Sequence, residues 1–188
     1  MAGPAGAARA VRPAGTVPVA APADLRRREP GRPPRVVVIG VGNPMRRDDG
    51  AGIAVVERAR PLLPPTVAVR TLRGEATSLL DAWAEADVAV VVDAVRWNHY
   101  PPSGVARIDA IAEADDIQAW GGGTSSHGLG VAEAVALGRA LDRLPPQLVL
   151  ILVTLVEGGH GEGLSPTVER YVERAVTQLI AEVRAATA

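Results

Sequence analysis

Three runs of β-branched and other aliphatic residues constrain most strongly what this chain can fold into. They occupy residues 35–41 (RVVVIGV), 87–95 (DVAVVVDAV) and 148–156 (LVLILVTLV). Nearly continuous apolar runs of this length are typical of strands that are buried on both faces of a parallel sheet. Segments with apolar residues at helical spacing separate the runs. The pattern therefore predicts an α/β domain, a three-layer sandwich whose mostly parallel central sheet carries helices on both faces.

The remaining predicted elements are shorter or less sharply bounded. The alternating run 66–72 predicts a further strand, and residues 104–108 predict an antiparallel edge strand. Helices are predicted along the apolar stripe Ile53, Val56 and Ala59, over residues 78–84 and 131–144, and from residue 165 onward. The last helix has Ser165 at its N-cap and Pro166 at its first helical position. Residues 110–119 favour neither a helix nor a strand.

The first 34 residues differ in composition from everything that follows. They hold seven of the 16 prolines, six arginines and only two acidic residues, and they show no periodic apolar face. Such a segment buries too little surface to offset its ordering entropy, so residues 1–34 are predicted to be a disordered arm without a function. A transit peptide and a start codon assigned too far upstream are the two alternatives. Residues 35–188 are predicted to form a single α/β domain.

The composition excludes several kinds of chemistry. The chain has no cysteine, which excludes thiolate nucleophiles and cysteine-ligated zinc or iron–sulfur sites. All 20 basic residues are arginine, so Schiff-base and P-loop lysines are absent as well. A net charge of −1 gives no indication of nucleic-acid binding, and no apolar run approaches the roughly 18 residues that a membrane span needs. We expect a soluble cytoplasmic protein that binds neither nucleic acid nor a membrane.

In sheets of this kind, ligands bind at the carboxyl ends of the strands. The segment that follows the first strand, Gly40-Val41-Gly42-Asn43-Pro44-Met45, begins like a dinucleotide fingerprint. Met45 stands where the fingerprint needs its third glycine, and Asp48 and Asp49 would repel a pyrophosphate at the start of the next helix. A nucleotide-binding oxidoreductase or transferase is therefore disfavoured. The site is better suited to a cation.

Two acids and one histidine are the candidate ligands for that cation. Asp49 precedes the first helix, Asp93 ends an otherwise apolar run, and His127 lies in a glycine-rich segment just before a helix. Two carboxylates and an imidazole suit a borderline divalent ion such as nickel or zinc. Structural alternatives remain open at this point. Asp48 and Asp49 can both be helix caps, Asp93 can pair with a nearby arginine (Arg46 or Arg96), and His127 can be a surface residue.

Five segments together resemble the hydrogenase maturation endopeptidases. They are Gly40-Val41-Gly42-Asn43-Pro44, Asp48-Asp49-Gly50-Ala51-Gly52, Val92-Asp93-Ala94, Ser126-His127-Gly128-Leu129 and Gly163-Leu164-Ser165-Pro166-Thr167-Val168. The resemblance covers about residues 36–184 in the family's order. It implies an endopeptidase, aspartyl-type or metal-assisted, that removes the C-terminal extension of the nickel–iron hydrogenase large-subunit precursor after nickel insertion.

The resemblance also implies how the metal is recognised. The family's three metal-contacting positions fall on Asp49, Asp93 and His127, the same residues that chemistry selects. Nickel would be carried by the precursor, and another divalent cation such as zinc or cadmium can occupy the site. We expect a monomer whose partner is that precursor. The alternative function is a noncatalytic α/β module that binds metal or precursor without cutting it.

Several further residues have structural roles as their simplest interpretation. Asn43 is predicted to support its turn, with a role in orienting substrate as the functional alternative. The segment Arg73-Gly74-Glu75-Ala76 departs from the acidic-Gly-Gly-Thr segment of many relatives, and Glu75 is the residue that can substitute for the missing acid. Ser125 and Ser126 adjoin His127, but adjacency does not make a catalytic triad. The residues predicted to have surface or packing roles are His99, His160, Trp83 and Trp120.

Overall fold

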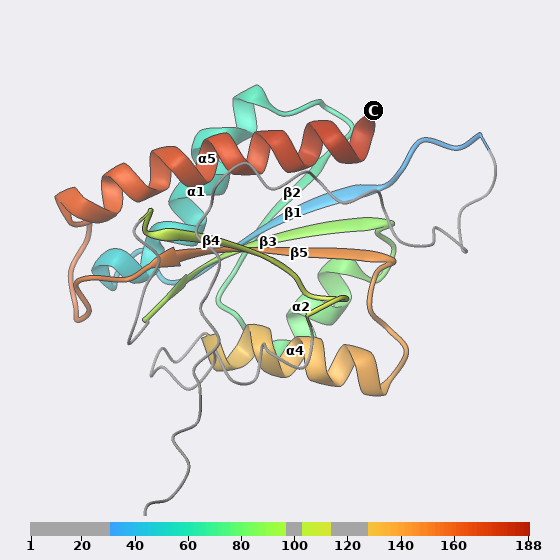
Figure 1. Ribbon diagram of the computed structural model, residues 1–188. Coiled ribbons are helices and arrows are strands. Elements are labelled where there is room, and N and C mark those ends of the chain that lie inside the picture. The colour runs from blue at the N-terminus through green and yellow to red at the C-terminus, as the bar shows by residue number, and fades with distance from the viewer. Residues whose placement is uncertain (1–30, 97–102, 114–127) are drawn as a thin grey trace, which may run out of the picture.

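A five-stranded sheet forms the middle of the molecule (Figure 1). The computed structural model describes residues 31–96, 103–113 and 128–188. In chain order the elements are β1 (Val36–Val41), the 3₁₀ helix η1 (Arg47–Gly50), α1 (Ala51–Ala59), the 3₁₀ helix η2 (Arg60–Leu62), β2 (Ala68–Leu72), α2 (Ala76–Trp83), β3 (Val88–Val95), β4 (Val105–Asp109), α4 (Gly128–Ala140), β5 (Gln147–Thr154) and α5 (Pro166–Thr187).

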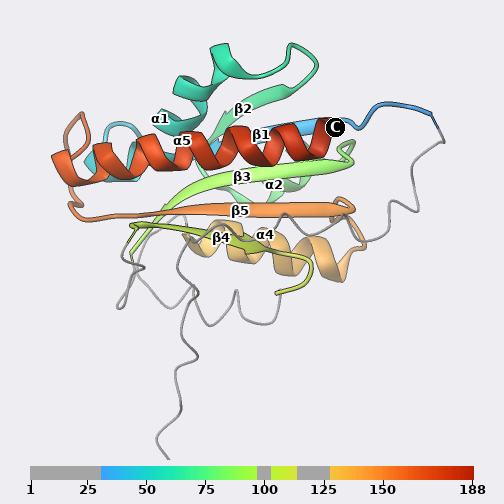
Figure 2. The ribbon, with the colours of Figure 1, turned by 45° about the horizontal axis from the view of Figure 1, so that its top comes forward.

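The strands lie in the order β2-β1-β3-β5-β4 (Figure 2). Neighbouring strands are parallel except β4, which runs antiparallel to β5 at one edge. The central strands β1, β3 and β5 are buried along almost their whole length, as expected for runs of valine and isoleucine covered on both faces. The predicted fold class, including the antiparallel edge strand, is confirmed.

Two strand ends lie two residues from their predicted positions, each for a local reason. The second strand was predicted to start at residue 66, but Val67 N donates to Pro64 O at 3.0 Å, so a turn occupies that position. The last strand was predicted to reach residue 156. It ends at Thr154, because the backbone N–H groups of Val156 and Glu157 donate to the carboxylate of Asp48 and are not available to the sheet.

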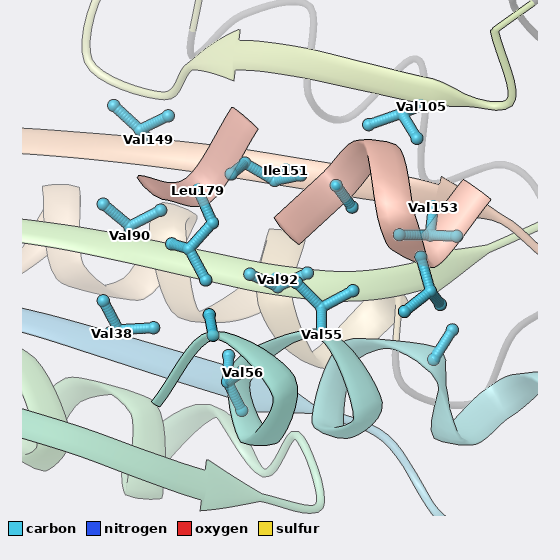
Figure 3. Close-up of a cluster of buried hydrophobic side chains, with 14 of the residues drawn as sticks. Val38, Val55, Val56, Val90, Val92, Val105, Val149, Ile151, Val153 and Leu179 are labelled. Carbon is cyan, nitrogen blue, oxygen red and sulfur yellow. The ribbon is translucent and has the colours of Figure 1, made fainter. Parts of the chain in front are cut away.

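Helices cover both faces of the sheet, with α1 and α5 on one side and α2 and α4 on the other (Figure 1). Along β3, alternate residues from Val88 to Ala94 pack beneath α1 and α5, and those between them face α2 and α4. Figure 3 shows the first of these apolar layers, with side chains of β1, β3, β5 and β4 meeting those of α1 and α5. No helix in the described part of the chain combines the length and apolar character of a membrane span.

A close backbone contact brings the start of α1 onto the sheet. A Cβ atom at Gly52 would lie 2.3 Å from Val41 O and 2.4 Å from Val92 O, so only glycine fits there. The first turn of α1 therefore rests on the carboxyl ends of β1 and β3. This contact brings η1, the turn immediately before α1, to the edge of the sheet where α/β proteins bind their ligands.

At the amino ends of the strands, opposite η1, part of the predicted arm contacts the domain. Arg32 donates two hydrogen bonds to the buried carboxylate of Asp87, at 2.8 and 3.0 Å. Asp87 also accepts a bond from Arg35 N at 2.7 Å, which joins the start of β1 to the start of β3. Residues 1–30 lie outside the described residues, so the arm stays a prediction.

Candidate active site

Asp48 is a structural anchor, and it does not cap a helix. The residue is 0% exposed, and its carboxylate accepts hydrogen bonds from Val156 N (3.2 Å), Glu157 N (2.6 Å), Ser165 N (2.7 Å) and Ser165 Oγ (3.0 Å). These donors come from the loop after β5 and from the N-cap of α5. The carboxylate of Asp48 is bonded to these donors and not to the start of η1 or α1, so the structural alternative that Asp48 caps this helix was wrong. Asp48 instead joins η1 to the loop after β5.

Asp49, the next residue, lies close to Asp93. Both residues are buried, with exposed fractions of 5% and 1%. The pKa of Asp93 is raised from 3.8 to about 8, mainly by burial; the hydrogen bond from Ala94 N lowers it, and the negative charge of Asp49 adds to the rise. The two acids come from distant parts of the sequence, yet the fold brings them near enough to interact electrostatically.

One oxygen of Asp93 is already satisfied and the other is not. Oδ1 accepts the bond from Ala94 N at 2.8 Å, whereas Oδ2 has no hydrogen-bond partner among the described residues. Among the described residues, Ala94 N is the one hydrogen-bond partner of the Asp93 carboxylate, so the structural alternative of a buried pair with Arg46 or Arg96 was wrong. A buried carboxylate oxygen without a donor is costly, and a cation is one way to compensate it.

His127, the third predicted ligand, lies outside the described residues. The helix that follows it, α4, starts at Gly128 and packs on the face of the sheet toward which Asp93 points. A Cβ atom at Gly130 would lie 1.8 Å from Gly74 O, so the first turn of α4 touches the loop between β2 and α2. Among the residues that the structure describes, no group of three His, Cys, Asp or Glu side chains could hold a metal ion. The three-residue ligand set stays a prediction.

The other candidates divide between confirmed structural roles and positions that are not described. Asn43 Oδ1 accepts a bond from Met45 N at 3.0 Å, which confirms that it supports the turn. Trp83 is fully buried and donates to Arg143 O at 3.2 Å, as a packing residue would. Glu75 and His160 are exposed. The candidates outside the described residues are His99, Trp120, Ser125 and Ser126.

The loop after β5 is tied to the turn that carries the acids. Arg47 N donates to Gly161 O at 2.8 Å, and Gly161 N donates to Met45 O at 3.0 Å. Arg47 adopts a φ of 52°, a left-handed conformation that is strained for a side chain of this size. The sequence did not predict this link or the role of Asp48. The available signal was that Ser165 and Asp48 both lie in segments that resemble the family.

Known proteins similar to this chain identify its family. The family model described as hydrogenase maturation protease matches residues 72–182, more than half of the chain. The chain belongs to the hydrogenase maturation protease family. It is 31% identical over 159 residues to the hydrogenase expression/formation protein HupD of Rhodobacter capsulatus, covering 82% of this chain and 73% of that protein. It is 29% identical over 153 residues to the hydrogenase 2 maturation protease of Escherichia coli, covering 80% and 91%.

Solved structures agree with this assignment. The hydrogenase-maturating endopeptidase HybD of Escherichia coli superposes with a TM-score of 0.67 at 28% identity, covering 80% of this chain and 92% of that one. The solution structure of an endopeptidase from Escherichia coli gives a TM-score of 0.70 at 27% identity, with the same coverage. This member of the hydrogenase maturation protease family is a hydrolase, an endopeptidase.

Proposed function

We propose that this maturation protease removes the C-terminal extension of the nickel–iron hydrogenase large-subunit precursor after nickel insertion, and that it recognises the inserted metal. The observation that supports this proposal is the proximity of Asp49 to Asp93, whose Oδ2 has no hydrogen-bond donor among the described residues. Two acids with like charges repel each other when both are ionised, and a divalent cation between them removes that repulsion. We place this reaction in the cytoplasm, with the protease acting as a monomer.

The donor chemistry fits nickel carried by the substrate. Carboxylate oxygens from Asp49 and Asp93 and an imidazole nitrogen from His127 are ligands that nickel or zinc accepts. Zinc or cadmium can occupy the same site in the isolated protein. When bound, the ion supplies Lewis acidity beside the scissile peptide. In this proposal, Asp49, Asp93 and His127 dock the metal-bearing end of the precursor and thereby orient its peptide bond for hydrolysis.

Asp48 contributes to the reaction indirectly. Its four hydrogen bonds hold η1 against the loop after β5, and this contact restricts where the adjacent Asp49 can move. A ligand that is already held in place loses little entropy when the metal arrives. We therefore assign Asp48 a positioning role and Asp49 a binding role.

The experiment compares two forms of the precursor. The purified protease is incubated with nickel-loaded and with nickel-free large-subunit precursor, and the mass of the precursor is measured over time. We expect a loss of mass at the C-terminus only for the nickel-loaded form. A stable complex without a change of mass would support the noncatalytic binding module instead, and equal cleavage of both forms would refute metal recognition.

Variants at the predicted ligands test the site itself. Asp93→Ala and His127→Ala are expected to abolish cleavage while the protein stays folded, because both residues serve the site more than the core. Glu182→Gln is the control, since Glu182 is another buried carboxylate but contacts Arg107 and Gln178, away from the site. Near wild-type cleavage by either alanine variant would show that the site is assigned to the wrong residues.

A further inference from the structure

Thr154, the last residue of β5, has a buried hydroxyl that no contact among the described residues explains. The residue is 1% exposed, and its Oγ1 atom has no hydrogen-bond partner among the described residues. Burying a hydroxyl without a partner destabilises a protein, and valine would fill the same space without that penalty. The positions of β5 before Thr154 carry Gln147 and then only aliphatic residues. Packing alone therefore does not account for a threonine at position 154, and its hydroxyl needs another reason to be there.

The strand register places this hydroxyl next to the candidate site. Along β5, Leu148, Leu150 and Leu152 face the α2 and α4 side of the sheet, so Thr154 faces that side as well. In β3, Asp93 faces the same side. Asp93 is paired with Leu152, and Thr154 is paired with Val95, so Thr154 is the diagonal neighbour of Asp93. It lies one pleat nearer the carboxyl edge of the sheet, where α1 brings η1 and its Asp49.

Asp93 Oδ2 and Thr154 Oγ1 therefore lie on the same face of two neighbouring strands. Both are buried oxygen atoms without partners among the described residues. Strands about 4.8 Å apart with a rise of about 3.3 Å per residue put the Cα atoms of diagonal neighbours roughly 8 Å apart. At that separation, a single oxygen atom held between the two side chains can bond to both. A hydroxyl is suited to this position because it can donate and accept.

We propose that Thr154 is a further substrate-contacting residue of this protease, and that its hydroxyl bonds an oxygen atom held beside Asp93. That oxygen belongs either to the attacking water or to the carbonyl of the scissile peptide. The inference rests on the proposed function and adds a residue to its site. Thr154 is present for the reaction, at the expense of the stability of the free protein.

The cleavage assay uses three variants of the full chain, Thr154→Val, Thr154→Ser and the control Thr177→Val. Thr177 lies on the exposed side of α5, where its hydroxyl bonds Glu173 O. Cleavage of the nickel-loaded precursor is followed by mass spectrometry, and thermal unfolding is followed in parallel. We expect Thr154→Val to lower kcat/KM by about tenfold or more, since losing one hydrogen-bond donor in an active site commonly has at least this effect. We expect Thr154→Ser and Thr177→Val to stay near wild type.

The kinetic constants show at which stage the bond forms. A fall in kcat at unchanged KM places the bond in the transition state, and a rise in KM at unchanged kcat places it in the bound substrate, on the carbonyl of the scissile peptide. The unfolding midpoint of Thr154→Val should equal or exceed that of wild type, because the threonine hydroxyl makes no bond with the described residues. Ser165→Ala is the stability control. It removes a buried hydroxyl that bonds Asp48 at 3.0 Å, and its midpoint should fall.

Three results would each overturn the inference while the proposed function stands. The first is cleavage by Thr154→Val at the wild-type rate, and the second is unfolding of Thr154→Val at a clearly lower temperature than wild type. The third is loss of activity in Thr154→Ser together with Thr154→Val, because serine keeps the hydroxyl. Failure of the wild-type protein to cleave the nickel-loaded precursor would refute the proposed function, and this inference with it.

Discussion

Replacing Asp93 with asparagine should stabilise the metal-free protein, and the gain should grow as the pH rises. Burial, with a contribution from the charge of Asp49, raises the pKa of Asp93 from 3.8 to about 8 in the folded chain. Between these two values, the folded protein binds a proton that the unfolded protein releases. Asparagine has nearly the same shape and carries no charge, so it removes this dependence on pH.

The sign and size of this dependence of stability on pH follow from proton linkage. Because the folded state binds more protons, the contribution of Asp93 to the wild-type free energy of unfolding is highest below pH 3.8 and falls as the pH rises toward about 8. The slope approaches about 1.4 kcal/mol per pH unit, so the loss between about pH 4 and pH 7 is of the order of 4 kcal/mol. The Asp93→Asn variant also buries an amide, which shifts its stability by an amount that does not vary with pH. The trend with pH is therefore the quantity to compare.

The assay is urea unfolding of wild type and Asp93→Asn at intervals from pH 5 to pH 8, with a chelator present to remove divalent ions. Asp81→Asn is the control, because the Asp81 side chain is 78% exposed. The difference between Asp93→Asn and wild type should widen steadily with pH, and Asp81→Asn should run parallel to wild type. A constant difference across this range would mean that Asp93 is charged in the folded protein, which would refute the reasoning from its burial.

Two further predictions concern the structural contacts around the domain. Asp48→Asn should lower the free energy of unfolding by about 3 kcal/mol, because an amide cannot accept all four bonds made by the carboxylate and leaves buried donors without partners. Urea unfolding at pH 7 measures this change, and a decrease of less than about 0.5 kcal/mol would contradict the prediction. Removing residues 1–30 or 1–34 should leave precursor cleavage unaffected, but only the longer deletion should lower the unfolding temperature, because it also removes the Arg32 bonds to Asp87. Equal unfolding temperatures for the two truncated proteins would show that these bonds add nothing to stability.

The central strands could be predicted because burial on both faces demands a continuous apolar run. β1, β3 and β5 satisfy that demand almost completely, and together they form the parallel centre of the sheet between its helical layers. The ends of strands were less predictable. The carboxyl end of β5 depends on which acceptor binds the N–H groups of Val156 and Glu157, and that acceptor, Asp48, lies far earlier in the sequence.

The roles of Asp48 and Asp49 could not be told apart from the sequence. Both are acids at the start of the same helix, and either could have been a cap or a ligand. Their roles differ because of contacts made by distant segments, namely the donors around Asp48 and the carboxylate of Asp93 near Asp49. Thr154 was missed for a related reason. A single threonine in an apolar strand looks like a tolerated β-branched residue until the register shows that it adjoins Asp93.

The adjacency of Asp48 and Asp49 gives the site its rigidity. A 3₁₀ helix has about three residues per turn, so successive side chains point about 120° apart. In η1 this rotation directs Asp48 into the loop after β5 and leaves Asp49 facing a different direction, toward Asp93. Two buried acids close together destabilise the free protein, and the four hydrogen bonds of Asp48 oppose their separation. In the proposed function, Asp49 and Asp93 bind the metal-bearing substrate, and Asp48 holds Asp49 in place without touching the metal itself.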